Sequence, residues 1–119
     1  MKNIFSTTTL LLTFTIISTQ VLGASVATKL CNSIRDNDRK QFRTLLESNQ
    51  INLKQTFSNA RCSGQNLLQF ASKNRSTGPG IVIINRITNV DILANMASLE
   101  NGPKELLNHA NKRFSKKKK

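Results

Sequence analysis

The sequence predicts an all-α fold, a small bundle of about four short helices within residues 24–90. Three observations indicate this. Apolar residues recur at helical spacing in successive segments, and polar or Gly-Pro breaks separate those segments. Only one apolar run, at 81–87, has the composition of a buried strand, and no second convincing strand is present to pair with it.

The first two predicted helices form a hairpin. Residues 25–34 carry apolar side chains four positions apart, at Val26, Leu30 and Ile34. The polar break "RDND" follows, and Asp36, Asn37 or Asp38 is expected to cap a second helix. The second helix is expected to bury Phe42, Leu45 and Leu46. A helix, a tight polar turn and another helix make an αα-hairpin.

The following segment is expected to begin with an extended loop, because residues 51–57 alternate apolar and polar side chains over only a short stretch. Ser63 and Gly64 interrupt the chain, and one of them is expected near the cap of a third helix. The third helix is expected to bury Leu67, Leu68, Phe70 and Ala71. A fourth helix is expected at 81–87, because Pro79 suits a helix start.

Residues 91–119 are predicted to be weakly structured, because their apolar residues are sparse. A short amphipathic helix around Leu106 and Leu107 is expected, and the terminal "KRFSKKKK" is predicted to be disordered. That basic tail has two interpretations, a cationic arm for a polyanion or a solvated segment that only aids solubility.

Residues 1–23 are predicted to be a cleaved signal peptide. Lys2 supplies the positive start, an uncharged apolar run follows, and Val21 and Gly23 offer the small residues needed before a cleavage site. An uncleaved membrane anchor is the alternative, because about 20 apolar residues are enough to span a bilayer. Hydroxyl side chains within the run favour cleavage, and we therefore expect a periplasmic or secreted protein without a stable membrane span.

The two cysteines, Cys31 and Cys62, are expected to be paired. An exported chain meets an oxidising compartment, and two cysteines allow only one intramolecular disulfide. Two free thiols, a metal site and a cysteine nucleophile are the alternatives. The last two are disfavoured because the chain has a single histidine, His109, far along the sequence.

The charge balance favours an anionic partner. The chain has 18 Lys and Arg against 6 Asp and Glu, a formal net charge of +12, and neither Trp nor Tyr to stack on exposed bases. The main candidate residues for polyanion binding lie on the polar side of the first predicted hairpin and at the C-terminus, and Lys54, Arg61, Lys73 and Arg75 are expected to extend the same positive surface. The main candidates are Arg35, Arg39, Lys40, Arg43, Lys116, Lys117, Lys118 and Lys119. For any one of them the alternative is an ordinary solvated charge.

Residues 30–74 resemble the family of small exported bacterial proteins catalogued as domain of unknown function 3718. In that family a cysteine opens the domain and a Cys-x-Gly-x-x-Leu-like motif follows, which corresponds here to Cys31, Cys62, Gly64 and Leu67. The resemblance implies bacterial export and a cysteine pair, and it supplies no activity.

The same segment is similar in pattern to ankyrin-type helical repeats. Fewer than two full units are expected, and the Thr-Pro-Leu-His signature of those repeats is replaced by Gln65, Asn66, Leu67 and Leu68. The similarity implies helix hairpins with a protein-binding face.

Together these patterns predict a non-catalytic binding module that acts on a protein partner or an anionic envelope component. The only close pair of carboxylates, Asp36 and Asp38, is expected to cap a helix, and no phosphate loop or nucleophile motif is present. No cofactor or metal is expected. The alternative function is nucleic-acid binding inside the cell, which would apply if the leader were not a signal.

Overall fold

The computed structural model describes residues 23–117, which form eight helices and no named strand. Residues 1–22, and with them nearly all of the predicted signal peptide, lie outside this range. The helices are α1 Ala24–Arg35, α2 Arg39–Ser48, α3 Leu53–Thr56, α4 Leu67–Lys73, α5 Thr77–Arg86, α6 Asn89–Ala94, α7 Met96–Glu100 and α8 Lys104–Lys117. No helix in the described range is long and apolar enough to cross a membrane.

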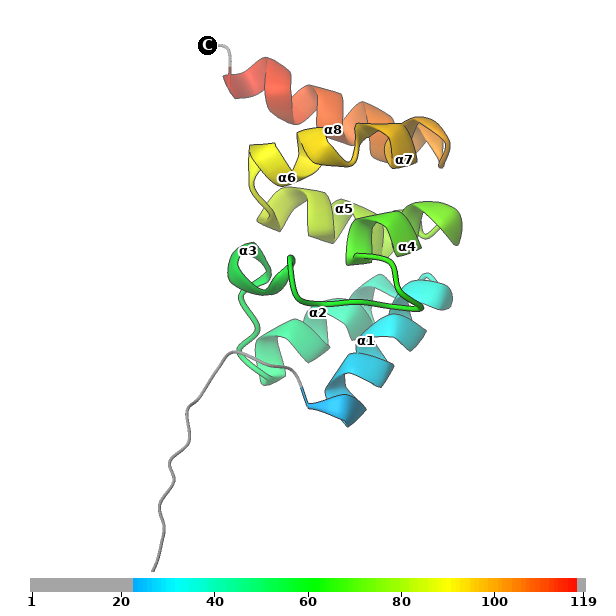
Figure 1. The fold of residues 1–119 in the computed structure, drawn as a ribbon, viewed down its shortest axis with the longest axis vertical. Helices are drawn as coiled ribbons and strands as arrows, with labels where there is room; N and C mark the ends of the chain where they lie inside the picture. Colours follow the sequence, from blue (N-terminus) through cyan, green and yellow to red (C-terminus); the bar gives the residue numbers. More distant parts are fainter. Residues whose placement is uncertain (1–22, 118–119) are drawn as a thin grey trace, which may run out of the picture.

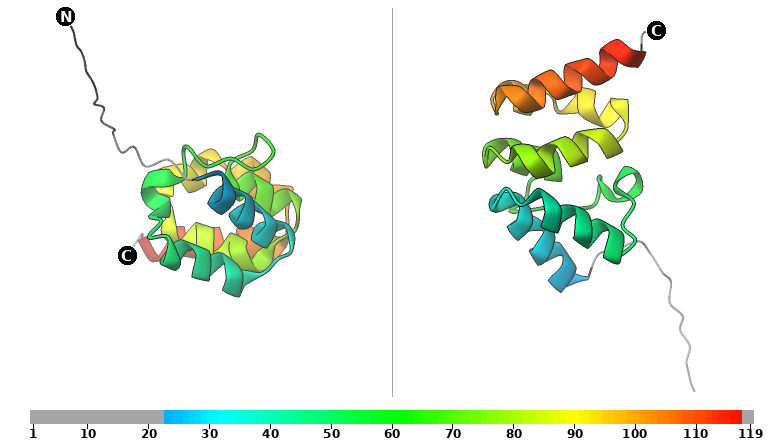
Figure 2. Two further views of the ribbon diagram at one scale, coloured as in Figure 1. Left: turned by 90° about the horizontal axis from the view of Figure 1, so that it is seen from below. Right: turned by 180° about the vertical axis from the view of Figure 1, so that it is seen from behind.

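Six of the helices form three antiparallel pairs, α1 with α2, α4 with α5, and α7 with α8, stacked along the long axis of the molecule (Figure 1). Within the stack, α1, α4 and α7 form one layer and α2, α5 and α8 form the other. The short helices α3 and α6 lie at the edge opposite the three hairpin turns, as the view from behind also shows (Figure 2). The molecule is therefore a short stack of helix hairpins.

The first two hairpin turns have the same backbone structure. The Asp38 N–H donates to the Ser33 carbonyl at 2.8 Å, and the Ser76 N–H donates to the Ala71 carbonyl at 2.8 Å. Asn37 and Arg75 occupy the equivalent left-handed position, with φ angles of 55° and 54°. This is the Schellman arrangement that ends a helix and satisfies its last carbonyls. The shared turn explains why α2 and α5 leave their partners in the same direction.

One hydrophobic core runs through all three pairs. Its fully buried members include Ile34 and Phe42 from the first pair, Leu68 and Ile83 from the second, and Leu99 and Leu106 from the third. Gly80 allows the second and third pairs to approach closely, because a Cβ atom there would lie 2.6 Å from Leu106 Cδ2.

Several predictions for the first half of the chain are confirmed. The helices of the first hairpin lie where the spacing placed them, and the Asp38 carboxylate caps α2 by accepting from the Gln41 N–H at 3.0 Å. Cys31 and Cys62 form a disulfide, with Cα atoms 5.7 Å apart. The disulfide joins α1 to the chain just before α4.

The cap of α4 differs from the prediction. Ser63 and Gly64 form a tight turn with φ angles of 52° and 79°, closed by two hydrogen bonds between Cys62 and Gln65. Asn66 caps α4 instead, because its side chain accepts from the Gln69 N–H at 2.8 Å while the Gln69 side chain accepts from the Asn66 N–H at 3.0 Å. This reciprocal pair is a capping box.

The second half of the chain is more ordered than predicted. The expectation of about four helices is wrong, since α3, α6 and α7 form as well. Residues 91–117 are not weakly structured, because Leu99, Leu106 and Ala110 are fully buried in the common core. Helix α8 continues to Lys117, so the predicted disorder beginning at Lys112 is wrong for most of that segment. Lys118 and Lys119 lie outside the described residues.

The repeat count also differs from the prediction. The similarity to helical repeats predicted fewer than two units, whereas three helix pairs are stacked. The third pair escapes recognition in the sequence because α7 is only five residues long. Three stacked pairs match the number that repeat proteins usually need to bury a continuous core.

Candidate polyanion-binding surface

Helix α2 presents cations on the side opposite its core contacts. Phe42, Leu45 and Leu46 are buried against the neighbouring helices, while the polar positions face solvent. Arg39 and Arg43 are one helical turn apart, so their side chains leave the same face of α2. Both arginines are exposed, and so is Lys40 between them.

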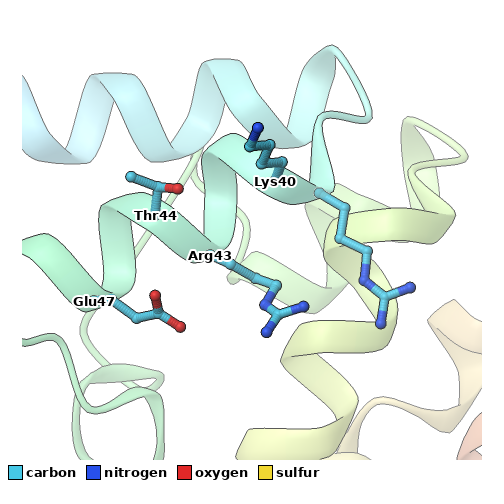
Figure 3. A pocket seen from close by; sticks show the side chains of 5 residues that line it. Lys40, Arg43, Thr44 and Glu47 are labelled. Carbon is cyan, nitrogen blue, oxygen red and sulfur yellow. The ribbon is translucent and has the colours of Figure 1, made fainter.

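Two shallow depressions flank this row of cations. The first has a volume of about 360 Å³ and is lined by Arg39, Lys40, Arg43, Thr44 and Glu47. Figure 3 shows Arg43 extending away from α1, whereas Lys40 and Thr44 point to the other side of α2. The cations of α2 therefore point in more than one direction from a single helix.

The second depression lies between α2 and α5. It has a volume of about 210 Å³, and Arg39 and Arg43 of α2 line it together with Val82, Asn85 and Arg86 of α5. Arg39 and Arg43 are thus shared by both depressions, and Arg86 adds a third guanidinium from the next helix pair. We call Arg39, Arg43 and Arg86 the basic face. The predicted residue Lys40 points to the other side of α2 and lines only the first depression.

The charge of the basic face is only weakly compensated. Within the described part of the chain, the one ion pair joins Arg86 Nη2 to Glu47 Oε2 at 3.9 Å. The two side chains are 36% and 63% exposed, so water screens this long contact and it contributes little to stability. The guanidinium groups of Arg39 and Arg43 remain available to bind carboxylate or phosphate oxygens, for which their planar donor geometry is suited.

Arg35, a predicted member of the site, lies apart from the basic face. Its Nη1 donates to Asn32 Oδ1 at 2.7 Å, and its guanidinium carbon lies 5.7 Å from the centre of the Phe70 ring on α4. This is a cation–π contact between α1 and α4. Arg35 therefore belongs to the other helix layer, where it links the first two pairs.

The predicted lysines of the C-terminus are only partly placed. Lys116 and Lys117 lie at the end of α8, and Lys118 and Lys119 fall outside the described residues. Their role in binding stays a prediction.

Sequence reasoning missed Arg86. The apolar content of the run at 81–87 predicts a buried helix, but only Val82, Ile83, Ile84 and Ile87 of the run are buried. Asn85 and Arg86 are the two polar residues of the run, and they mark where α5 meets the surface. These two polar residues within an apolar run were the sequence feature that could have identified Arg86 as a surface residue.

A third depression lies on the other layer, between α4 and α7. It has a volume of about 330 Å³, and its lining includes Lys73 and Arg75. No cluster of three or more His, Cys, Asp or Glu side chains suited to a metal ion is present within residues 23–117.

Comparison with known proteins identifies the family. The model of the family described as "Protein of unknown function (DUF3718)" matches residues 30–94, more than half of the chain. The chain belongs to this family. The match covers α2 to α6 completely and includes both cysteines and the whole basic face. No curated protein and no solved structure matched the chain.

Proposed function

We propose that this DUF3718 protein is an exported, non-catalytic binding module whose basic face engages an anionic component of the cell envelope. The observation that carries the proposal is the convergence of Arg39, Arg43 and Arg86 from two helix pairs on one depression. Of these three guanidinium groups, only that of Arg86 has a carboxylate partner among the described residues, in the long ion pair with Glu47. The three groups together favour binding of phosphate or carboxylate groups. The depressions are shallow and open, which suits a polymer or surface better than an enclosed small substrate.

Export is supported by the cysteines. Disulfides persist in oxidising compartments and are rare in the cytosol, so a pairing of Cys31 with Cys62 fits a protein that has crossed the inner membrane. The signal peptide predicted at residues 1–23 also supports export.

Binding by the basic face is tested by titration with long-chain inorganic polyphosphate at several salt concentrations. The double variant Arg39→Gln/Arg43→Gln keeps helix-forming side chains while removing two charges. We expect it to bind roughly tenfold more weakly than the native protein. The slope of log affinity against log salt should fall by about 2, because two fewer counterions are displaced.

The matched control is Lys73→Gln/Arg75→Gln, which removes the same charge from the other helix layer. Its affinity should change little. Equal losses in the two variants would show that only the net charge matters, and the basic face would then not be the binding site. A short DNA duplex titrated in parallel examines the nucleic-acid alternative, which gains support if the duplex binds more tightly than polyphosphate.

Export is tested by the intact mass of the protein recovered from its native host, measured with and without reductant and alkylation. We expect a mass that lacks about the first 23 residues and is two hydrogens below that of the dithiol. A full-length mass with two alkylatable thiols would contradict export and move the search for a ligand to the membrane anchor or to intracellular nucleic acid.

A further inference from the structure

Asn85 of α5 lines the depression between α2 and α5 together with the three arginines of the basic face. Its side chain is held from α8, because His109 Nε2 lies 2.7 Å from Asn85 Oδ1. An amide oxygen can only accept a hydrogen bond, so in this contact His109 donates from Nε2. Asn85 therefore turns its oxygen toward α8 and keeps both Nδ2 hydrogens for an acceptor elsewhere.

Helix α8 is anchored at the position from which His109 reaches Asn85. The view from behind shows α8 stacked on α5, which in turn lies beside α2 (Figure 2). Arg113, one helical turn after His109, donates from Nη1 to the carbonyl of Ile84, the residue before Asn85. Ala110 of the same helix is fully buried in the core. The third helix pair thus holds a polar side chain at a depression that the first two pairs form.

We infer that the depression between α2 and α5 binds one terminal phosphate group, in which Asn85 Nδ2 donates to a phosphate oxygen beside the guanidinium groups of the basic face. His109 is the residue that positions the Asn85 amide for this contact. The inference rests on the proposed function, and it narrows the ligand from any anionic group to a phosphate monoester or the end of a phosphate chain.

The donor set suits a terminal phosphate better than a carboxylate. A carboxylate has two oxygens and one charge, and a single guanidinium fork can satisfy it. A phosphate monoester has three strong acceptor oxygens and close to two charges near neutral pH. The depression offers three guanidinium groups and one amide from two helix pairs, which matches the larger number of oxygens and the higher charge.

The carboxylate of Glu47 is the competing group at this site. Its ion pair with Arg86 is 3.9 Å long, and both side chains are in contact with water. Such an exposed pair contributes little free energy. A doubly charged phosphate can therefore replace Glu47 as the partner of Arg86 at little cost.

Two small anions of similar charge test the choice of ligand. Inorganic pyrophosphate consists of two terminal phosphates, whereas citrate carries its charge on carboxylates. We expect the native protein to bind pyrophosphate roughly tenfold more tightly than citrate at equal ionic strength. In NMR spectra, the side-chain amide resonances of Asn85 should shift with pyrophosphate.

Removal of the amide tests its contribution. Asn85→Ala should bind pyrophosphate roughly fivefold more weakly, because a donor to a charged oxygen is lost. The salt dependence of binding should stay the same, since no charge is removed. Asn108→Ala is the matched control, because Asn108 is an exposed amide of α8 outside the lining of the depression. This control should bind like the native protein.

The positioning role of His109 is tested at about pH 8, where a histidine side chain is ordinarily neutral. His109→Ala should weaken pyrophosphate binding in the native background and have no further effect in Asn85→Ala. His109→Gln keeps an N–H that can donate to Asn85 Oδ1, so it should retain most of the native affinity. Equal losses from His109→Ala in both backgrounds would contradict the positioning role. Circular dichroism checks that each variant keeps the native helical content.

A terminal phosphate can also belong to a lipid, so vesicles of phosphatidylcholine with and without phosphatidic acid form a second arm. Sedimentation with the phosphatidic acid vesicles that Asn85→Ala weakens would assign the phosphate to a lipid headgroup. Binding of pyrophosphate without sedimentation would assign it to a soluble or polymeric ligand.

The inference is overturned if citrate binds as tightly as pyrophosphate, or if Asn85→Ala binds pyrophosphate like the native protein. These outcomes are separable from failure of the proposed function. If Arg39→Gln/Arg43→Gln leaves polyphosphate binding unchanged, the basic face is not the binding site and both proposals fail. If that variant loses affinity as expected while Asn85→Ala does not, only the assignment of a terminal phosphate site fails.

Discussion

The first and last helix pairs of the stack are secured in different ways. At the first pair, the Cys31–Cys62 disulfide ties α1 to the chain ahead of α4. At the last pair, close packing replaces the covalent bond, because Gly80 lies against Leu106 and Gly102 lies against Ser72. An end pair in a stack has only one neighbour, so it gains less interface than a central pair. Each end of this short stack therefore carries an additional constraint.

The lengths of the connections account for the difference. A long segment, residues 49–66, joins α2 to α4 and contains only the single turn of α3. A disulfide that closes a long loop restricts the unfolded chain strongly. Between α5 and α7 the connection is nearly all α6, so there is less loop entropy to remove. Tight contact between the pairs supplies the constraint there.

The largest expected effect is at the first pair. Replacement of both cysteines, Cys31→Ala/Cys62→Ala, should lower the free energy of unfolding by about 3 to 4 kcal/mol, because the unfolded chain regains the entropy of a loop of about 32 residues. Urea unfolding monitored by circular dichroism measures the loss. Hydrogen exchange should show that amides of α1 and α2 lose more protection than those of α7 and α8.

The native protein with and without reductant is the control for this experiment, since reduction removes the same bond without changing side-chain volume. A loss below about 1 kcal/mol would mean that packing alone holds the first pair. An equal loss of protection at both ends would contradict the idea that the two ends are secured separately.

The same contrast appears in what could be predicted from the sequence. The first pair follows from local patterns, because Leu30, Ile34, Phe42 and Leu46 recur at helical spacing over helices of ten or more residues. Helices α6 and α7 have six and five residues, too few for a periodic pattern to be visible. Leu99 is fully buried, and α7 packs against α4 as well as α8, an arrangement that local spacing does not encode.

The residues of the candidate site also fall into those that sequence spacing predicts and those that only helix packing brings together. Arg39, Lys40 and Arg43 share one helix, so spacing along α2 was enough to group them. Arg86 joins them only because α2 packs beside α5. Arg35 is predicted to share the polar side of the hairpin with them, but the structure places it in the other layer, against Phe70. Arg86 was missed and Arg35 was wrongly included because membership of the site depends on how the helices pack together, which spacing along one helix does not show.

A smaller effect is expected at the last pair. Alanine at Gly102 would place its Cβ over the Ser72 hydroxyl, although φ at Gly102 lies outside the left-handed region and suits any residue. The clash must displace Ser72, whose Oγ donates to the Ser98 carbonyl at 2.6 Å. We expect Gly102→Ala to lower the free energy of unfolding by about 2 kcal/mol, measured by urea unfolding.

A double-mutant cycle with Ser72→Ala separates this clash from a general loss of packing. Ser72→Ala alone removes one hydrogen bond and should cost about 1 kcal/mol. In combination with Gly102→Ala it also removes the overlapping hydroxyl, so the double variant should be more stable than the sum of the two single losses by about 1 kcal/mol. Simple additivity would show that Gly102 and Ser72 are not in conflict, and the last pair would then be held by Leu106 and the core alone. A positive coupling would instead show that Gly102 and Ser72 are in direct contact, and that this close packing helps to hold the last pair where the first pair has a disulfide.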